Sequence, residues 1–213
     1  MLPGTKIVHQ RLAGFNKGAA EDLRQALSKI KKEGAAGIVL DLRDNPGGLL
    51  DEAVDVASQF LQSGNVLLEK DARGRETPVA VEAGGDAQHM PLVELVNGGT
   101  ASGAEFVAGA FQDNHRAQLV GETTLGTGTV LNEFKLTDGS ALLLAIEQWL
   151  TPDGHVIWHK GITPNIVVKL PPDVLPVFPE AEHTMNAAQL RGCGDTQLLR
   201  AMDLLRLPAS KSS

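Results

Sequence analysis

The sequence has 213 residues, of which 42% are apolar and 21% charged, and its formal net charge at pH 7 is −7. A chain of this length can bury one sizeable core, and its acidic balance argues against a nucleic-acid partner. The single cysteine, Cys193, excludes a disulfide within the chain. The chain has no apolar run of about 18 residues, so no membrane-spanning helix is predicted.

Predicted strands and helices alternate along the first half of the chain. Asn16 is the expected N-cap of the first helix, and Gly34 is its expected C-terminal cap. The strand–helix–strand order predicts crossover units of parallel strands in an α/β fold. In chain order the expected elements are a strand at 6–9, a helix at 20–30, a strand at 37–42, a helix at 50–61, a strand at 66–69, a strand at 92–96 and a helix that begins at Glu105.

The second half predicts further strands around an Asp138-Gly139 hairpin turn, and then a tail. A proline-rich linker at 171–179 separates a core, residues 1–170, from the tail 171–213. The tail should carry an amphipathic helix that docks on the core or packs on a missing partner. The expected elements are strands at 117–120, 134–136, 141–146 and 166–168, a loop at 121–128 and a helix at 196–207. The residues expected to be buried in the sheet are Leu40, Val93, Leu95 and Leu119.

Ser102 lies between the strand at 92–96 and the following helix, just after a turn of Asn and Gly. The free N–H groups and the positive dipole end of that helix would lie close to its hydroxyl. This is a suitable position for a nucleophile whose attack creates an oxyanion. The simpler alternative is that Ser102 only caps the helix.

A second strand-to-turn segment, Asp41-Leu42-Arg43-Asp44-Asn45-Pro46-Gly47-Gly48, points to the first interpretation. It resembles the D-L-R-x-N-P-G-G signature of the carboxyl-terminal processing proteases, also called tail-specific proteases. Gly99-Thr100-Ala101-Ser102-Gly103-Ala104-Glu105 resembles their G-S-A-S-A-S-E nucleophile segment. The resemblance implies an α/β fold of stacked strand–turn–helix units, as in the crotonase and Clp-protease superfamily. It also implies that Ser102 is the nucleophile and that the N–H groups of Gly48 and Gly103 form the oxyanion hole.

The family's base is missing from the matching position. These proteases use a buried lysine in a Gly-Lys-Gly segment, where Gly126-Thr127-Gly128 stands here, and threonine has no proton-accepting group with a useful pKa. The family often has a glutamine four residues farther on, where this chain has Leu131. Thr127 and Leu131 therefore mark the two positions at which the resemblance predicts a loss of catalytic machinery.

Several side chains are candidates for a replacement base. Lys135 stands near the substituted loop, and Lys160 lies in a turn that resembles the family's K-G-I-x-P-D segment. The histidines at 115, 155 and 159 are expected at the surface. None of these matches the role well. We find no metal-binding or phosphate-loop spacing, so neither a cofactor nor a metal is predicted.

Two functions follow as expectations. The first is a serine endopeptidase core of the tail-specific type, which acts on polypeptides near their C-termini. The second is a catalytically silent relative that binds extended peptides or mediates assembly, so an oligomer is possible. Relatives carry a PDZ domain ahead of this core, and the resemblance suggests the cell envelope or periplasm. No segment here is long enough to be a PDZ domain, so we expect the chain to be a fragment, an excised piece or a natural short form. Residues 1–4 do not resemble a signal peptide, so any export signal is expected outside this chain.

Overall fold

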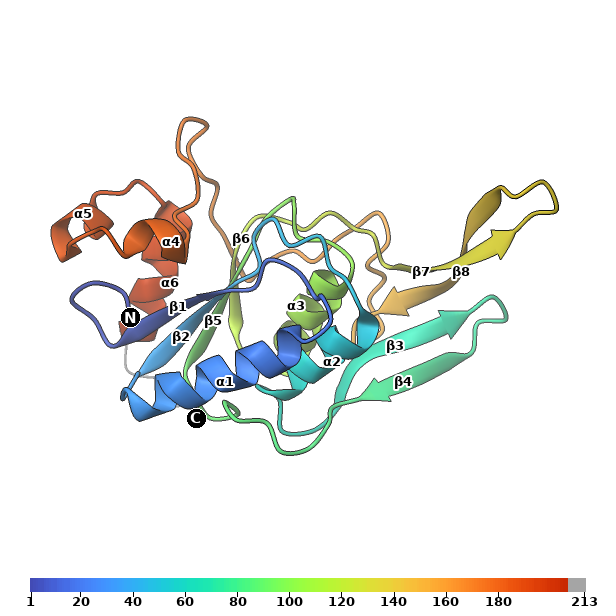
Figure 1. The fold of residues 1–213 in the computed structure, drawn as a ribbon, viewed down its shortest axis with the longest axis horizontal. Coiled ribbons are helices and arrows are strands. Elements are labelled where there is room, and N and C mark those ends of the chain that lie inside the picture. Colours follow the sequence, from blue (N-terminus) through green and yellow to red (C-terminus); the bar gives the residue numbers. More distant parts are fainter. Residues whose placement is uncertain (207–213) are drawn as a thin grey trace.

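The computed structural model of the chain describes residues 1–206 (Figure 1). Its strands are β1 (Ile7–Arg11), β2 (Gly37–Asp41), β3 (Asn65–Asp71), β4 (Glu76–Ala80), β5 (Leu92–Val96), β6 (Gln118–Gly121), β7 (Thr129–Lys135), β8 (Ala141–Leu150) and β9 (Ile166–Val167). Its helices are α1 (Ala19–Lys32), α2 (Leu50–Ser58), α3 (Gly103–Asp113), α4 (Pro179–Glu182), α5 (Ala187–Arg191) and α6 (Thr196–Arg206).

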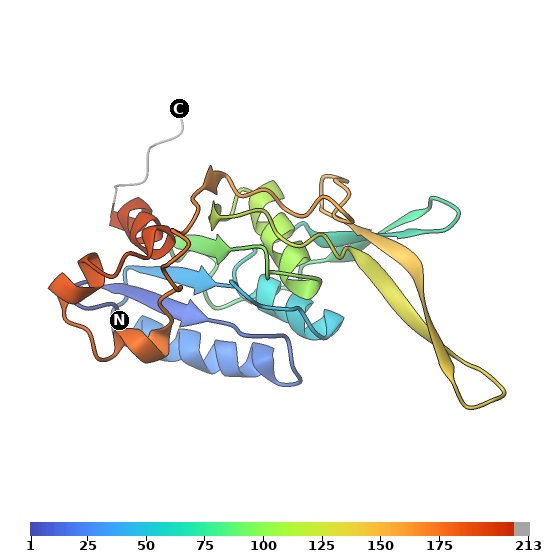
Figure 2. The same cartoon turned by 90° about the horizontal axis from the view of Figure 1, so that it is seen from above.

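A five-stranded parallel sheet, in the order β1-β2-β5-β6-β9, forms the centre of the molecule. Helices α1, α2 and α3 contribute to the apolar cluster on one face, and α6 packs on the other face (Figures 1 and 2). In β2, Ile38 and Leu40 point to the first cluster and Val39 to the second. Because both faces are covered, the central strands β2 and β5 are apolar except for Asp41 at the end of β2 and Glu94 in β5.

A second sheet is antiparallel, in the order β4-β3-β8-β7. Its β7–β8 hairpin projects away from the body of the molecule (Figures 1 and 2). Strand β7 is an edge of this sheet, so one side of its backbone has no strand partner within residues 1–206. The large apolar side chains that the hairpin exposes are Leu131, Phe134, Leu136, Leu142, Leu143, Leu144 and Ile146.

The predicted α/β class, the crossover order and the buried positions are confirmed. The four residues expected in the sheet, Leu40, Val93, Leu95 and Leu119, are each at most 4% exposed. In the part of the chain that the structure describes, no helix is both long and apolar enough to cross a membrane.

The start of α1 differs from the prediction. Gly18, with φ +91°, is the N-cap, and the predicted cap Asn16 lies two residues earlier. The carboxylate of Glu52, from α2, accepts hydrogen bonds from the N–H groups of Gly18 and Ala20 at 2.6 and 2.9 Å. A tertiary contact therefore supplies the acceptor that a local cap would supply. The predicted terminator Gly34 lies one residue beyond the C-cap, with φ +73°.

Other element ends also shift. Helix α3 begins at Gly103, two residues before the predicted start at Glu105. Strands β7 and β8 extend the predicted 134–136 and 141–146 strands, because their pairing continues to Thr129 and Gln148. The segment after the linker carries two short helices, α4 and α5, that the sequence did not predict. The predicted end of the last helix at Leu207 falls outside the described residues.

Candidate active site

Ser102 lies at the N-cap of α3, six residues after the end of the central strand β5. Its backbone has φ +52° and ψ −121°, a conformation that residues other than glycine rarely adopt. Such strain persists only where the surroundings enforce it, and it is concentrated at functional sites. The placement at a strand-to-helix turn agrees with the sequence prediction.

The turn formed by residues 45–48 packs directly against Ser102. A Cβ atom added to Gly47 would lie 2.6 Å from the Cβ of Ser102, so only glycine fits there. Asn45 fixes the turn, because its carbonyl oxygen accepts from the Ala101 N–H at 2.9 Å and its Oδ1 accepts from the Gly47 N–H at 2.8 Å. The bond from Ala101 thus joins the two motifs at the residue before the serine.

The N–H groups of Gly48 and Gly103 lie close together beside this turn. A Cβ atom on Gly103 would lie 3.6 Å from the Gly48 nitrogen. Neither N–H donates a backbone hydrogen bond within residues 1–206. Two neighbouring backbone donors without an acceptor, at a helix N-terminus, can bind an anion.

The hydroxyl of Thr127 contacts the backbone of Ser102 directly. Its Oγ1 accepts a hydrogen bond from the Ser102 N–H at 2.7 Å and donates one to Oε2 of Glu105 at 2.8 Å. The threonine hydroxyl is therefore committed to the backbone of the serine and to a carboxylate.

Glu105 is a residue whose contribution to the site the sequence analysis missed. Its side chain is fully buried in the first turn of α3. Oε2 accepts from the N–H groups of Ser102 and Thr127 at 2.9 and 2.8 Å, besides the Thr127 hydroxyl. Oε1 accepts from the Thr124 hydroxyl and the Gly126 N–H, both at 2.6 Å. The only signal in the sequence was the glutamate three residues after a potential N-cap.

The segment 157–162 supports the loop that carries Thr127. The His159 N–H donates to the Gly126 carbonyl at 2.9 Å, and the Ile162 N–H donates to Oγ1 of Thr124 at 2.7 Å. The side chain of His159 is exposed and stacks on Trp158, with 4.6 Å between the ring centroids. This segment positions the loop through its backbone.

The structure does not place every predicted residue beside the serine. Leu131 lies in β7 with 59% of its side chain exposed, and none of the contacts described above includes it. The side chains weighed as replacement bases are exposed: Lys135, Lys160, His115, His155 and His159.

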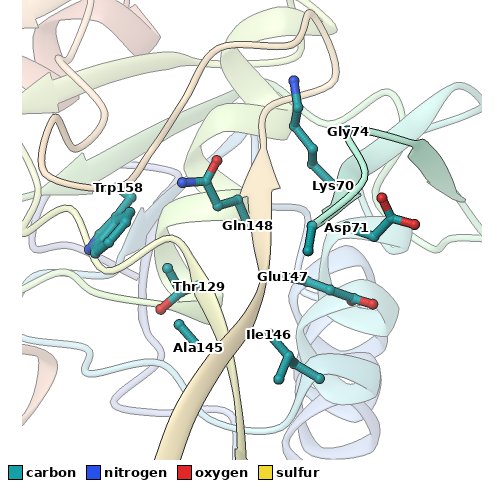
Figure 3. Close-up of a pocket in the computed structure, with 10 residues that line it drawn as sticks. Lys70, Asp71, Gly74, Thr129, Ala145, Ile146, Glu147, Gln148 and Trp158 are labelled. Carbon is teal, nitrogen blue, oxygen red and sulfur yellow. The ribbon is translucent and has the colours of Figure 1, made fainter.

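A cavity of about 400 Å³ opens near the start of the β7–β8 hairpin (Figure 3). Thr129, two residues after Thr127, forms part of its wall, and Trp158 lies across from Gln148 and Lys70. The wall of the cavity therefore includes a residue only two positions after Thr127, the loop residue that contacts Ser102.

Known proteins are similar to this chain in sequence and in fold. The family model of peptidase family S41 matches residues 6–168. A carboxyl-terminal-processing protease of Synechocystis sp. is 37% identical over 204 residues, which cover 95% of this chain and 44% of the relative. A probable CtpA-like serine protease of Staphylococcus epidermidis is 42% identical over 159 residues, covering 74% of this chain and 32% of the relative.

A solved structure, that of a photosystem II D1 C-terminal processing protease, matches with a TM-score of 0.77 and 34% sequence identity. The match covers 85% of this chain and 47% of that protein. The chain thus spans less than half the length of these relatives.

Proposed function

Because the chain belongs to peptidase family S41, we propose that it is a serine endopeptidase core of the carboxyl-terminal processing type. In this proposal Oγ of Ser102 attacks the carbonyl carbon of a peptide bond, and the carbonyl oxygen becomes an oxyanion. The N–H groups of Gly48 and Gly103 stabilise that oxyanion. The observation that carries the proposal is the strained serine beside two backbone donors that lack acceptors.

The proposed reaction also needs a group that takes the proton of the serine hydroxyl. A threonine hydroxyl does not ionise near neutral pH, and that of Thr127 is already bonded to Glu105. A positioned base typically contributes about 10²–10⁴ in rate. We therefore propose that the chain as it stands cleaves slowly, with its rate limited by position 127.

The proposed substrates are polypeptides, cut near their C-termini. This follows from relatives named carboxyl-terminal processing proteases, with which the chain shares its core. The same resemblance leads us to propose the cell envelope or periplasm as the location.

One observation favours a second candidate function, the binding of extended peptides without cleavage. The free edge of β7 begins two residues after Thr127, and an extended peptide could add to it as a further strand. The cavity at the start of the hairpin could receive a side chain of such a peptide (Figure 3).

A cleavage assay on casein and on a tailed substrate tests the proposal. The proteins compared are the parent, Ser102→Ala, Thr127→Lys, and Thr127→Lys combined with Leu131→Gln. Thr127→Val serves as the matched control, because it removes the hydroxyl without adding an amine. We expect weak cleavage by the parent, none by Ser102→Ala and a clear gain on Thr127→Lys.

Efficient Ser102-dependent cleavage by the parent would show that another base operates. No cleavage by any folded variant, together with binding of the tailed substrate, would favour the peptide-binding function.

A further inference from the structure

A buried cluster of charged side chains joins β1 and β2 to the C-terminal segment 177–206. His9, in β1, has no exposed side-chain surface. Its Nε2 lies 2.9 Å from Oδ2 of Asp41, and its Nδ1 lies 2.8 Å from Oε2 of Glu182. Asp41 ends β2 and Glu182 ends α4, so the imidazole bridges the sheet and the C-terminal segment.

The two contacts require a proton on each ring nitrogen, because a carboxylate only accepts and a neutral imidazole has a single N–H. Burial lowers the pKa of His9, but its hydrogen bonds to Asp41 and Glu182 and their negative charges outweigh burial and hold the pKa above 6.5. Burial raises the pKa of Asp41, but its bonds to His9 and Arg43 bring that pKa below its usual value. His9 is therefore an imidazolium between two carboxylates.

Arg43 makes a second connection to the same segment. Its guanidinium binds Asp41 through Nε and Nη2, with a shortest distance of 2.6 Å. On its other side, Nη1 lies 2.9 Å from Oδ2 of Asp195 and Nη2 donates to the Val177 carbonyl at 3.3 Å. Oδ2 of Asp195 also accepts from the Val177 N–H at 2.8 Å.

The negative charge of this cluster is offset most fully while His9 is protonated. Three buried carboxylates, those of Asp41, Glu182 and Asp195, then face two cations. The guanidinium of Arg11 lies 3.7 Å from the centre of the Phe178 ring and adds positive charge at the margin. His9 also lines an adjoining cavity of about 350 Å³. The other charged or titratable residues around that cavity are Lys29, Glu33, Glu180, His183 and Met1, which carries the terminal amine.

We propose that protonated His9 fastens α4 and its neighbouring residues, 178–184, to the parallel sheet, and that loss of its proton releases them. A neutral ring would turn a lone pair toward one of the two carboxylates in a site closed to water, and that contact would become repulsive. Helix α6 stays in place, because Leu198 and Met202 pack in the apolar cluster under it. Val177 and Leu190 also stay, because they belong to the same cluster and Val177 is bonded to Arg43 and Asp195.

The sign of the pH dependence follows from the raised pKa. Docking is complete below the ordinary value of 6.5 and is lost as pH rises through the folded-state pKa. Hydrogen–deuterium exchange of the whole protein, followed by mass spectrometry from about pH 6 to about pH 9, measures this directly. After correction for intrinsic exchange, protection of 178–184 should fall by up to about tenfold per pH unit between pH 6.5 and the folded-state pKa of His9 and level off above it, while β5 stays protected.

Two variants make the test specific. His9→Gln should show low protection of 178–184 at every pH. His183→Gln, the matched control, removes an exposed histidine next to the end of α4 and should keep the parent profile. A parent profile that is flat across the range, or one that His183→Gln abolishes, would overturn the proposal.

A second measurement covers the case in which His9→Gln does not fold. Glu182→Gln keeps a side chain of the same size and should move the midpoint of release to lower pH. Nitrogen NMR of the parent near neutral pH should find His9 with both ring nitrogens protonated. A neutral His9 ring under these conditions would overturn the proposal independently of any variant.

Discussion

The carboxylate of Glu105 holds both halves of the candidate site, the serine and the loop that carries Thr127. It is fully buried, and every hydrogen bond it accepts comes from residues 102 or 124–127. A buried donor that loses its acceptor costs about 1–3 kcal/mol. The relative position of Ser102 and Thr127 thus depends on a side chain to which we assign no chemical step.

Glu105→Ala should lower the free energy of unfolding by about 3 kcal/mol or more, because several buried donors lose their acceptor together. Glu105→Gln should cost less, since its carbonyl oxygen can still accept. Urea unfolding of both variants measures this, with Glu133→Gln, which alters an exposed carboxylate on β7, as the control. A urea midpoint for Glu105→Ala equal to that of the parent would contradict the proposed contribution of the carboxylate.

Among the strands, β5 carries an unusual residue at its centre. Glu94 has no exposed surface, and neither of its oxygens has a hydrogen-bond partner within residues 1–206. It lies between Leu40 of β2 and Leu119 of β6 in the paired strands. Burial raises the pKa of Glu94 well above 4.5, so the strand carries a protonated carboxyl group in its core.

Glu94→Val should raise the free energy of unfolding at neutral pH by about 1–3 kcal/mol, because it removes an unpaired buried polar group. The folded state keeps its proton above pH 4.5 whereas the unfolded state loses it, so this residue makes the parent less stable as pH rises. The variant should lack that decline. Urea unfolding at about pH 5 and about pH 8 measures the difference, and an equal decline in both proteins would contradict it.

The elements that could be predicted from the sequence are those whose patterns are local. The apolar residues of β2 and β5 reflect strands that are buried on both faces, and the helical spacing of apolar residues in α1 reflects a helix that is buried on one face. The cap of α1 by Glu52 could not be predicted, because it joins residues more than thirty positions apart. The same holds for Glu105, whose donors become visible only when the loop at 124–127 folds back on α3.

At the scale of the whole molecule, apolar clusters on both faces of the parallel sheet hold the fold together. Val93 belongs to the cluster under α6, with Leu198 and Met202. The C-terminal segment is therefore part of the same packed body as the sheet that positions Ser102.

Val93→Asp should destabilise the protein by about 3–5 kcal/mol, because it places an unpaired charge in that cluster. Val167→Asp is the matched control, since the side chain of Val167 is 59% exposed. Thermal unfolding of both variants gives the comparison. Unchanged melting of a soluble Val93→Asp protein would show that this face of the sheet is not buried as described.

The central claim is that Ser102 is a nucleophile in a formed oxyanion site, limited by the residue at position 127. Labelling with a fluorophosphonate probe tests it most directly, because only an activated serine reacts rapidly. We expect slow labelling of the parent, none of Ser102→Ala, and a gain of about 10²-fold or more in Thr127→Lys. Equal labelling rates in the parent and a folded Thr127→Lys, or labelling that persists in Ser102→Ala, would contradict the claim.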